Sequence, residues 1–104
     1  MKTFKDIEIE VNGSTARGSL VLREDIIVSL FGGHGAYGDG ENTFEFAVMN
    51  STGDLYKLSE FDDVIGWLEE DDINKHIKTI CDDPDKFLTE CAKREIDGIV
   101  SLDS

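Results

Sequence analysis

The sequence predicts an α+β fold in a single domain, residues 1–104: an antiparallel sheet of about five strands, formed by an N-terminal meander, then two to three C-terminal helices packed on one face. Three observations predict it. Apolar and polar residues alternate in the first half, which is the period of half-buried strands. After residue 58 the apolar period becomes 3.6, as in amphipathic helices. A length of 104 residues suits one modest core.

The first two strands are predicted to form a hairpin. Residues 6–11 alternate acids with branched apolar residues, as a strand with one buried face does. Asn12-Gly13 follows at once, and this pair favours a type I′ turn because both central residues must adopt positive φ. A two-residue loop there places Glu8 opposite Arg17, a favourable cross-strand pair.

Three further strands are expected in the first half. One covers residues 26–31 (IIVSLF), and the next covers 43–49 with alternate aromatic and aliphatic residues on one face. Residues 50–54 (NSTGD) are typical of a turn, and residues 55–58 follow as a short fifth strand.

The first helix is predicted to begin at Ser59, a good N-cap. Its expected apolar stripe has the spacing i, i+3, i+4, i+7 and consists of Phe61, Val64, Ile65 and Leu68. A second helix is expected to bury a stripe made of Ile73, Ile77, Ile80 and Cys81.

The third helix is predicted to begin at Asp83-Pro84, with aspartate as the cap and proline in the first helical position. We expect Asp97-Gly98 to end it and residues 99–102 to return as a short strand. The apolar residues that this helix should bury are Phe87, Leu88, Cys91 and Ala92.

The charge is strongly negative and unevenly distributed. The net charge is −13, and residues 59–104 hold fourteen acids against five bases. Such a surface repels nucleic acid and anionic membranes, so a basic protein is the favoured partner, without direct nucleic-acid or membrane binding. The sequence shows no signal peptide and no apolar run of membrane-spanning length, and its two cysteines suit reduced thiols, so a cytoplasmic location is expected.

A glycine-rich segment at residues 32–42 (GGHGAYGDGEN) is predicted to join two strands. It satisfies G-x-G-x-x-G literally, but a dinucleotide site requires a helix after that motif. Two interpretations remain: a flexible surface loop, or a loop that contacts a partner through His34 and Tyr37.

No metal or cofactor is expected. The soft ligands lack the paired spacing of zinc sites, and these are His34, His76, Cys81 and Cys91. No spacing selects a nucleophile with a base, so the chain is expected not to be an enzyme.

The acidic residues are the remaining candidates. On a helix starting at Ser59, Asp62 and Glu69 would share the face opposite the apolar stripe, as would the next residue of each. The alternative is a solvated face with acids favoured at helix N-termini. The candidate partner-binding residues are Asp62, Asp63, Glu69, Glu70, Asp71, Asp72, Asp82, Asp83 and Asp85, with Tyr37 and His34 from the glycine-rich loop.

These observations favour a small acidic, non-enzymatic inhibitor that blocks a basic nuclease or nucleic-acid-binding protein. In charge and size the chain resembles phage anti-defence proteins, which include anti-CRISPR and anti-restriction proteins and some DNA mimics. It is similar in the same respects to immunity proteins that neutralise bacterial toxin nucleases. A third alternative is a small enzyme or ligand-binding protein that uses residues 32–42.

Overall fold

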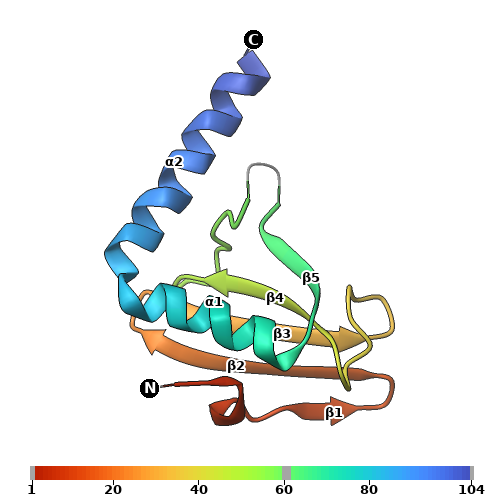
Figure 1. Cartoon of the computed structure of the whole chain (residues 1–104). Helices are drawn as coiled ribbons and strands as arrows, with labels where there is room; N and C mark the ends of the chain where they lie inside the picture. The colour runs from red at the N-terminus through yellow and green to blue at the C-terminus, as the bar shows by residue number, and fades with distance from the viewer. Residues whose placement is uncertain (1, 60–61, 104) are drawn as a thin grey trace.

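The computed structural model describes residues 2–59 and 62–103, and from residue 97 onward it describes the backbone alone. Within these residues a five-stranded antiparallel sheet, in the order β1-β2-β3-β4-β5, is followed by two helices, which confirms the α+β prediction (Figure 1). The elements are β1 (Glu10–Asn12), β2 (Thr15–Arg23), β3 (Ile26–Gly33), β4 (Phe44–Met49), β5 (Val64–Leu68), α1 (Glu70–Asp82) and α2 (Pro84–Asp103).

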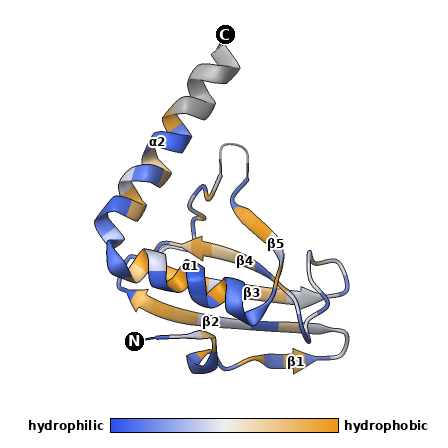
Figure 2. Ribbon diagram, viewed as in Figure 1, coloured by the Kyte–Doolittle hydropathy of each residue, from blue (hydrophilic) through white to orange (hydrophobic). Residues whose placement is uncertain are grey.

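The core lies between α1 and one face of the sheet. Ile73, Ile77 and Ile80 of α1 are buried, at the helical spacing that the sequence predicted. They form one cluster with the inward-facing residues of the strands. Figure 2 shows that the junction between α1 and α2 is hydrophilic. The predicted inward face of β4 is confirmed, because Phe44, Phe46 and Val48 are all buried.

The first hairpin forms, but its predicted register is wrong by two residues. Glu10, and not Glu8, stands opposite Arg17, and Asn12 pairs with Thr15. The loop is therefore Gly13-Ser14, with glycine at positive φ in its first position, which is where a type II′ turn places glycine. A shift by two residues keeps every side chain on its predicted face, so the alternation alone cannot detect it.

The segment after residue 58 differs most from the prediction. The predicted strand 55–58 is reduced to a single bridge between Leu55 and Met49, and Val64–Leu68 forms β5 instead of a helix. The Ser59 hydroxyl accepts the Asp62 N–H at 3.2 Å in a turn, and the expected contact of Phe61 lies outside the described residues. Pairing with β5 satisfies backbone groups of β4 that a helix here would leave without partners.

A bulge explains why β5 imitates a helix in the sequence. Phe46 pairs with Ile65 and Phe44 pairs with Leu68, so one residue of β4 stands opposite two of β5, Gly66 and Trp67. The extra residue turns Leu68 back to the core face that Ile65 also occupies. Apolar residues three apart thus share one face, which is the spacing that the sequence analysis assigned to a helix.

The two helices are joined at Asp83, which caps α2 as predicted by accepting the Lys86 N–H at 3.1 Å. Three other details are wrong: Cys81 and Ala92 are exposed, and α2 continues through Asp97-Gly98 to Asp103, so residues 99–102 are helical. The C-terminal half of α2 projects beyond the sheet (Figure 1). Among the described residues, neither helix has the length and apolar composition needed to cross a bilayer.

Two isoleucines on the helices give a matched test of this core. Ile77 is fully buried and Ile96 is 62% exposed. We expect Ile77→Ala to lower the free energy of unfolding by about 2–5 kcal/mol, since it leaves a cavity, and Ile96→Ala to change it by less than about 0.5 kcal/mol. Urea titration followed by circular dichroism measures both. Equal effects would contradict the position of α1 on the sheet.

Candidate functional site

The predicted acidic row does not form. Asp62 and Asp63 precede β5 and Glu69 and Glu70 follow it, so a strand of five residues, roughly 16 Å long, separates the two pairs. All four carboxylates are exposed, but they share no helix face. Asp63 lies instead beside Asp54 and Glu95, in a hollow next to α2. The prediction was wrong because it depended on the helix that β5 replaces.

The predicted residues at the junction of α1 and α2 have structural roles. Asp82 forms an ion pair with Lys78 (2.7 Å), Asp85 forms one with Arg23 (3.0 Å), and Asp83 caps α2. These acids lie at the far end of α1 from Glu69, and a helix of 13 residues separates them by about 20 Å. They cannot act on one small contact with the acids at the start of α1.

The structure does gather a different set of carboxylates. Glu41, from the loop between β3 and β4, lies at the same hollow as Glu69, Glu70 and Asp71 at the start of α1. Phe4, Asn42 and Phe44 complete the lining, and no lysine or arginine is among these described residues. We call Glu41, Glu69, Glu70 and Asp71 the acidic hollow. The predicted Asp72 does not line the hollow, and its carboxylate accepts the Glu69 N–H at 3.3 Å.

Asp39 holds the loop that carries Glu41. Its Oδ1 atom accepts the backbone N–H groups of Glu41, Asn42 and Thr43 at 2.8, 2.8 and 2.9 Å. These hydrogen bonds favour the ionised carboxyl and lower the pKa of Asp39 from 3.8 to about 2. The Thr43 hydroxyl accepts the Asp39 N–H at 3.0 Å in return. A segment rich in glycine is therefore fixed by its one central carboxylate.

Several backbone N–H groups of the same loop donate to carbonyl groups within it. Gly33 N–H donates to Gly38 O (2.9 Å), Ala36 N–H to Gly33 O (3.1 Å), and Gly40 N–H to Thr43 O (2.9 Å). A phosphate cradle needs free N–H groups that point at the ligand. This arrangement, together with the carboxylate of Asp39, disfavours a phosphate site despite the G-x-G-x-x-G match. His34 is exposed, and its backbone N–H donates to the backbone carbonyl of Ser14 at 3.0 Å.

Tyr37 and Trp67 are two exposed aromatic residues whose backbones lie next to each other. The backbone N–H of Trp67 donates to the backbone carbonyl of Tyr37 at 2.6 Å. A Cβ added to Gly66 would approach the Tyr37 Cβ to 2.5 Å. The two side chains are nevertheless 60% and 62% exposed. In the described part of the chain, neither ring stacks on another aromatic ring. We call Tyr37 and Trp67 the aromatic pair.

The backbone at Trp67 is strained. Its φ is +59°, and it is the one described residue other than glycine with positive φ. A bulky side chain in the left-handed region is an outlier that costs about 1–3 kcal/mol. Such strain is often found at functional sites, and bulges are known to redirect a side chain beside them.

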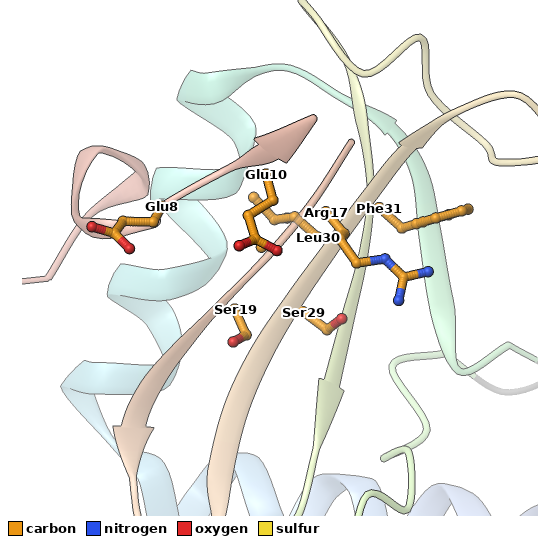
Figure 3. Close-up of a pocket in the computed structure, with 8 residues that line it drawn as sticks. Glu8, Glu10, Arg17, Ser19, Ser29, Leu30 and Phe31 are labelled. Atoms are coloured by element: carbon orange, nitrogen blue, oxygen red, sulfur yellow. The ribbon is translucent and has the colours of Figure 1, made fainter. Parts of the chain in front are cut away.

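A second hollow opens on the sheet face away from α1 (Figure 3). Arg17 extends over the ring of Phe31, with its guanidinium carbon 5.2 Å from the ring centroid, and Glu10 is the cross-strand neighbour of Arg17. Ser19 and Ser29 face each other two residues further along β2 and β3 from Arg17 and Phe31 (Figure 3). The cation of this hollow is thus already stacked on an aromatic ring of the same sheet.

Two further titratable groups are His76, which is half-buried, and Cys91, which is buried. His76 is half-buried, with its ring 5.3 Å from that of Phe46, and desolvation lowers its pKa although Asp72 opposes the shift. Burial raises the pKa of the Cys91 thiol, which Arg94 approaches at 3.8 Å. Within the residues that the structure describes, no three potential ligands gather as a metal site would require.

The sequence analysis missed Glu41, Glu45 and Trp67. Two signals pointed to the strand that positions Trp67: the adjacent β-branched residues Val64-Ile65, and Gly66 in the interior of the predicted helix. Glycine there would cost about 1 kcal/mol relative to alanine. Nothing in the sequence places Glu41 beside α1, because that proximity follows from the path of the loop.

The strain at Trp67 predicts an unusual order of stabilities. In an ordinary strand, glycine is less stable than alanine. At positive φ this order reverses, and we expect Trp67→Gly to be more stable than Trp67→Ala by about 1 kcal/mol. Urea unfolding followed by circular dichroism compares the two variants directly. A more stable alanine variant would contradict the left-handed conformation.

Asp39 gives a prediction that depends on pH. Because its pKa of about 2 lies below the ordinary 3.8, its stabilisation is fully present above roughly pH 4 and is lost as the pH falls through 2. A carbon-detected NMR titration should find this carboxyl titrating lowest among the aspartates. We also expect Asp39→Ala to abolish hydrogen-exchange protection of the Glu41 to Thr43 amides, and Asp39→Asn, which keeps one acceptor oxygen, to preserve part of it. An ordinary pKa would refute these bonds.

No family model, curated protein or solved structure matches this chain. Its function must therefore be inferred from its own surface. Two features stand out there: the acidic hollow at the start of α1, and the aromatic pair formed by the loop after β3 and by β5.

Proposed function

We propose that this protein is a small non-enzymatic inhibitor that binds and blocks a basic protein partner, a nuclease or another nucleic-acid-binding protein. The observation that carries the proposal is the acidic hollow, where two segments distant in sequence bring four carboxylates together without a lining lysine or arginine. The net charge of the whole molecule, −13, has the same sign as the hollow. A phosphate-binding surface, rich in lysine and arginine, is the complement of such a site.

The carboxylates of the hollow chiefly affect which partner is bound and how fast it associates. An exposed ion pair contributes only about 0–1 kcal/mol, because water and salt screen it. A strong field of one sign nevertheless accelerates the encounter with an oppositely charged protein and disfavours acidic ones. The proposed partner is thus recognised first by its positive charge, and its binding should weaken steeply with salt.

The proposal no longer uses regular rows of carboxylates along a helix. Rows of carboxylates at regular spacing would resemble DNA phosphates, but residues 64–68 form β5 and the rows do not exist. What remains is a compact acidic site, which suits either of the two classes already considered. A phage anti-defence protein would direct it at a defence nuclease, and an immunity protein would direct it at a toxin nuclease.

The alternative of a ligand-binding loop at residues 32–42 has less support. Backbone N–H groups of the loop donate to carbonyls within it, to Ser14 O, and to the carboxylates of Asp39 and Glu45. The loop instead presents Tyr37 and Glu41 outward, which fits a contact with another protein.

A charge-reversal experiment tests the proposal. We expect Glu41→Lys/Glu70→Lys to reduce recovery of the partner by about tenfold in a low-salt affinity capture from the lysate of the source organism. The protein recovered by the unaltered chain should be basic, should bind nucleic acid, and should be released by moderate salt or competing DNA. Neither substitution removes the capping carboxylates Glu69 and Asp72, so α1 should keep its start.

The matched control is Glu24→Lys/Glu90→Lys. It changes the net charge equally, at exposed positions in the turn after β2 and on α2. Recovery should be close to that of the unaltered chain. Equal losses in both variants would assign the effect to net charge alone, and capture of acidic partners that resist salt would refute the proposal.

A further inference from the structure

We infer that the aromatic pair, Tyr37 and Trp67, is the apolar anchor of this interface and that it receives an arginine side chain of the basic partner. The inference rests on the proposed function, because it names the group of the basic partner that this aromatic surface would accept. It commits to a planar guanidinium, as opposed to basic residues in general.

The first argument is the exposure of the pair. Isolated exposed apolar residues are common on protein surfaces, but this protein exposes two large aromatic residues whose backbones are hydrogen-bonded to each other. The 2.6 Å hydrogen bond from Trp67 N–H to Tyr37 O joins the two backbones, and Gly66 leaves the room that Tyr37 occupies. Tyrosine and tryptophan are the residues most often found at the energetic centre of interfaces.

The second argument is the charge around the pair. Glu45 stands opposite the bulge, and its Oε2 lies 3.3 Å from the Tyr37 N–H. Aromatic rings bordered by carboxylates favour a cation, since the ring face is negative and the carboxylate supplies an acceptor.

Among cations, arginine suits this surface best. Its guanidinium is flat enough to stack on an aromatic face and can still donate two parallel hydrogen bonds to a carboxylate. A lysine ammonium is more strongly hydrated and makes neither contact as well. Basic nucleic-acid-binding surfaces are rich in arginine, so the partner of the proposed function would supply it.

The protein contains an internal example of the same arrangement. On the open face of the sheet, the Arg17 guanidinium lies 5.2 Å from the centroid of the Phe31 ring, and Glu10 is the cross-strand neighbour of Arg17 (Figure 3). No described cation of the chain occupies the aromatic pair in this way. The exposed rings of the pair thus offer a guanidinium from outside what the Phe31 ring offers Arg17 within the sheet.

Trp67 is the only tryptophan, so its fluorescence reports this site directly. The probes are two synthetic peptides of equal length and charge, with glycine and serine spacers, one carrying four arginines and the other four lysines. We expect the arginine peptide to bind about tenfold more tightly at low salt and to shift the Trp67 emission. Equal affinity of the two peptides would overturn the inference.

Variants separate the anchor from the charge. Tyr37→Ala and Trp67→Gly should remove the preference for arginine while leaving the affinity for the lysine peptide unchanged, as measured by anisotropy of labelled peptides. Val11→Ala, at an apolar position that is 74% exposed on β1, is the control and should keep the preference. A preference that persists without either aromatic residue would also overturn the inference.

The two proposals fail in distinguishable ways. If both peptides bind equally and Glu41→Lys/Glu70→Lys weakens both, the acidic hollow acts without an aromatic anchor, and only the inference is refuted. If neither peptide binds at low salt, the inference and the cationic partner of the proposed function are both refuted.

Discussion

The pairing of β4 with β5, and the bulge within it, is the constraint on which the rest of the structure depends. β4 carries Phe44 and Phe46, two large side chains of the core, and its second edge needs a partner for its backbone groups. β5 supplies that partner, and the extra residue at Gly66-Trp67 turns Leu68 back to the core. The chain then enters α1 in position to bury its three isoleucines.

The same bulge organises the surface. It holds Trp67 in a left-handed conformation against Tyr37, which links β5 to the loop after β3. That loop is itself fixed by Asp39, whose one oxygen accepts three backbone N–H groups. Two segments that glycine could have left mobile are thus locked together. They expose Tyr37, Trp67 and Glu41, residues on which the two proposals rest.

The acidic residues are not equivalent, although the sequence presents them as one excess of charge. Asp39, Asp72 and Asp83 satisfy backbone N–H groups, and Asp85 joins Arg23 and Asp25 in holding the start of α2 to the turn after β2. The Arg23 guanidinium holds the pKa of Asp25 below its usual range. The carboxylates of the acidic hollow differ from these, because among them only Glu69 has such a structural role, as the cap of α1.

The sequence by itself determined the fold class, the strands at residues 26–31 and 43–49, the buried isoleucines of α1 and the start of α2 at Asp83-Pro84. These follow from periodicity, capping and proline geometry, which act over a few residues. Only the tertiary structure decided that residues 64–68 form a strand, that the first hairpin is shifted by two, and that Glu41 meets α1. The strand at residues 64–68 and the position of Glu41 depend on partners distant in sequence, whereas the shifted hairpin keeps every side chain on its face, so the alternation does not fix its register. An apolar spacing of three residues fits a helix or a bulged strand equally well until the unpaired edge of β4 selects between them.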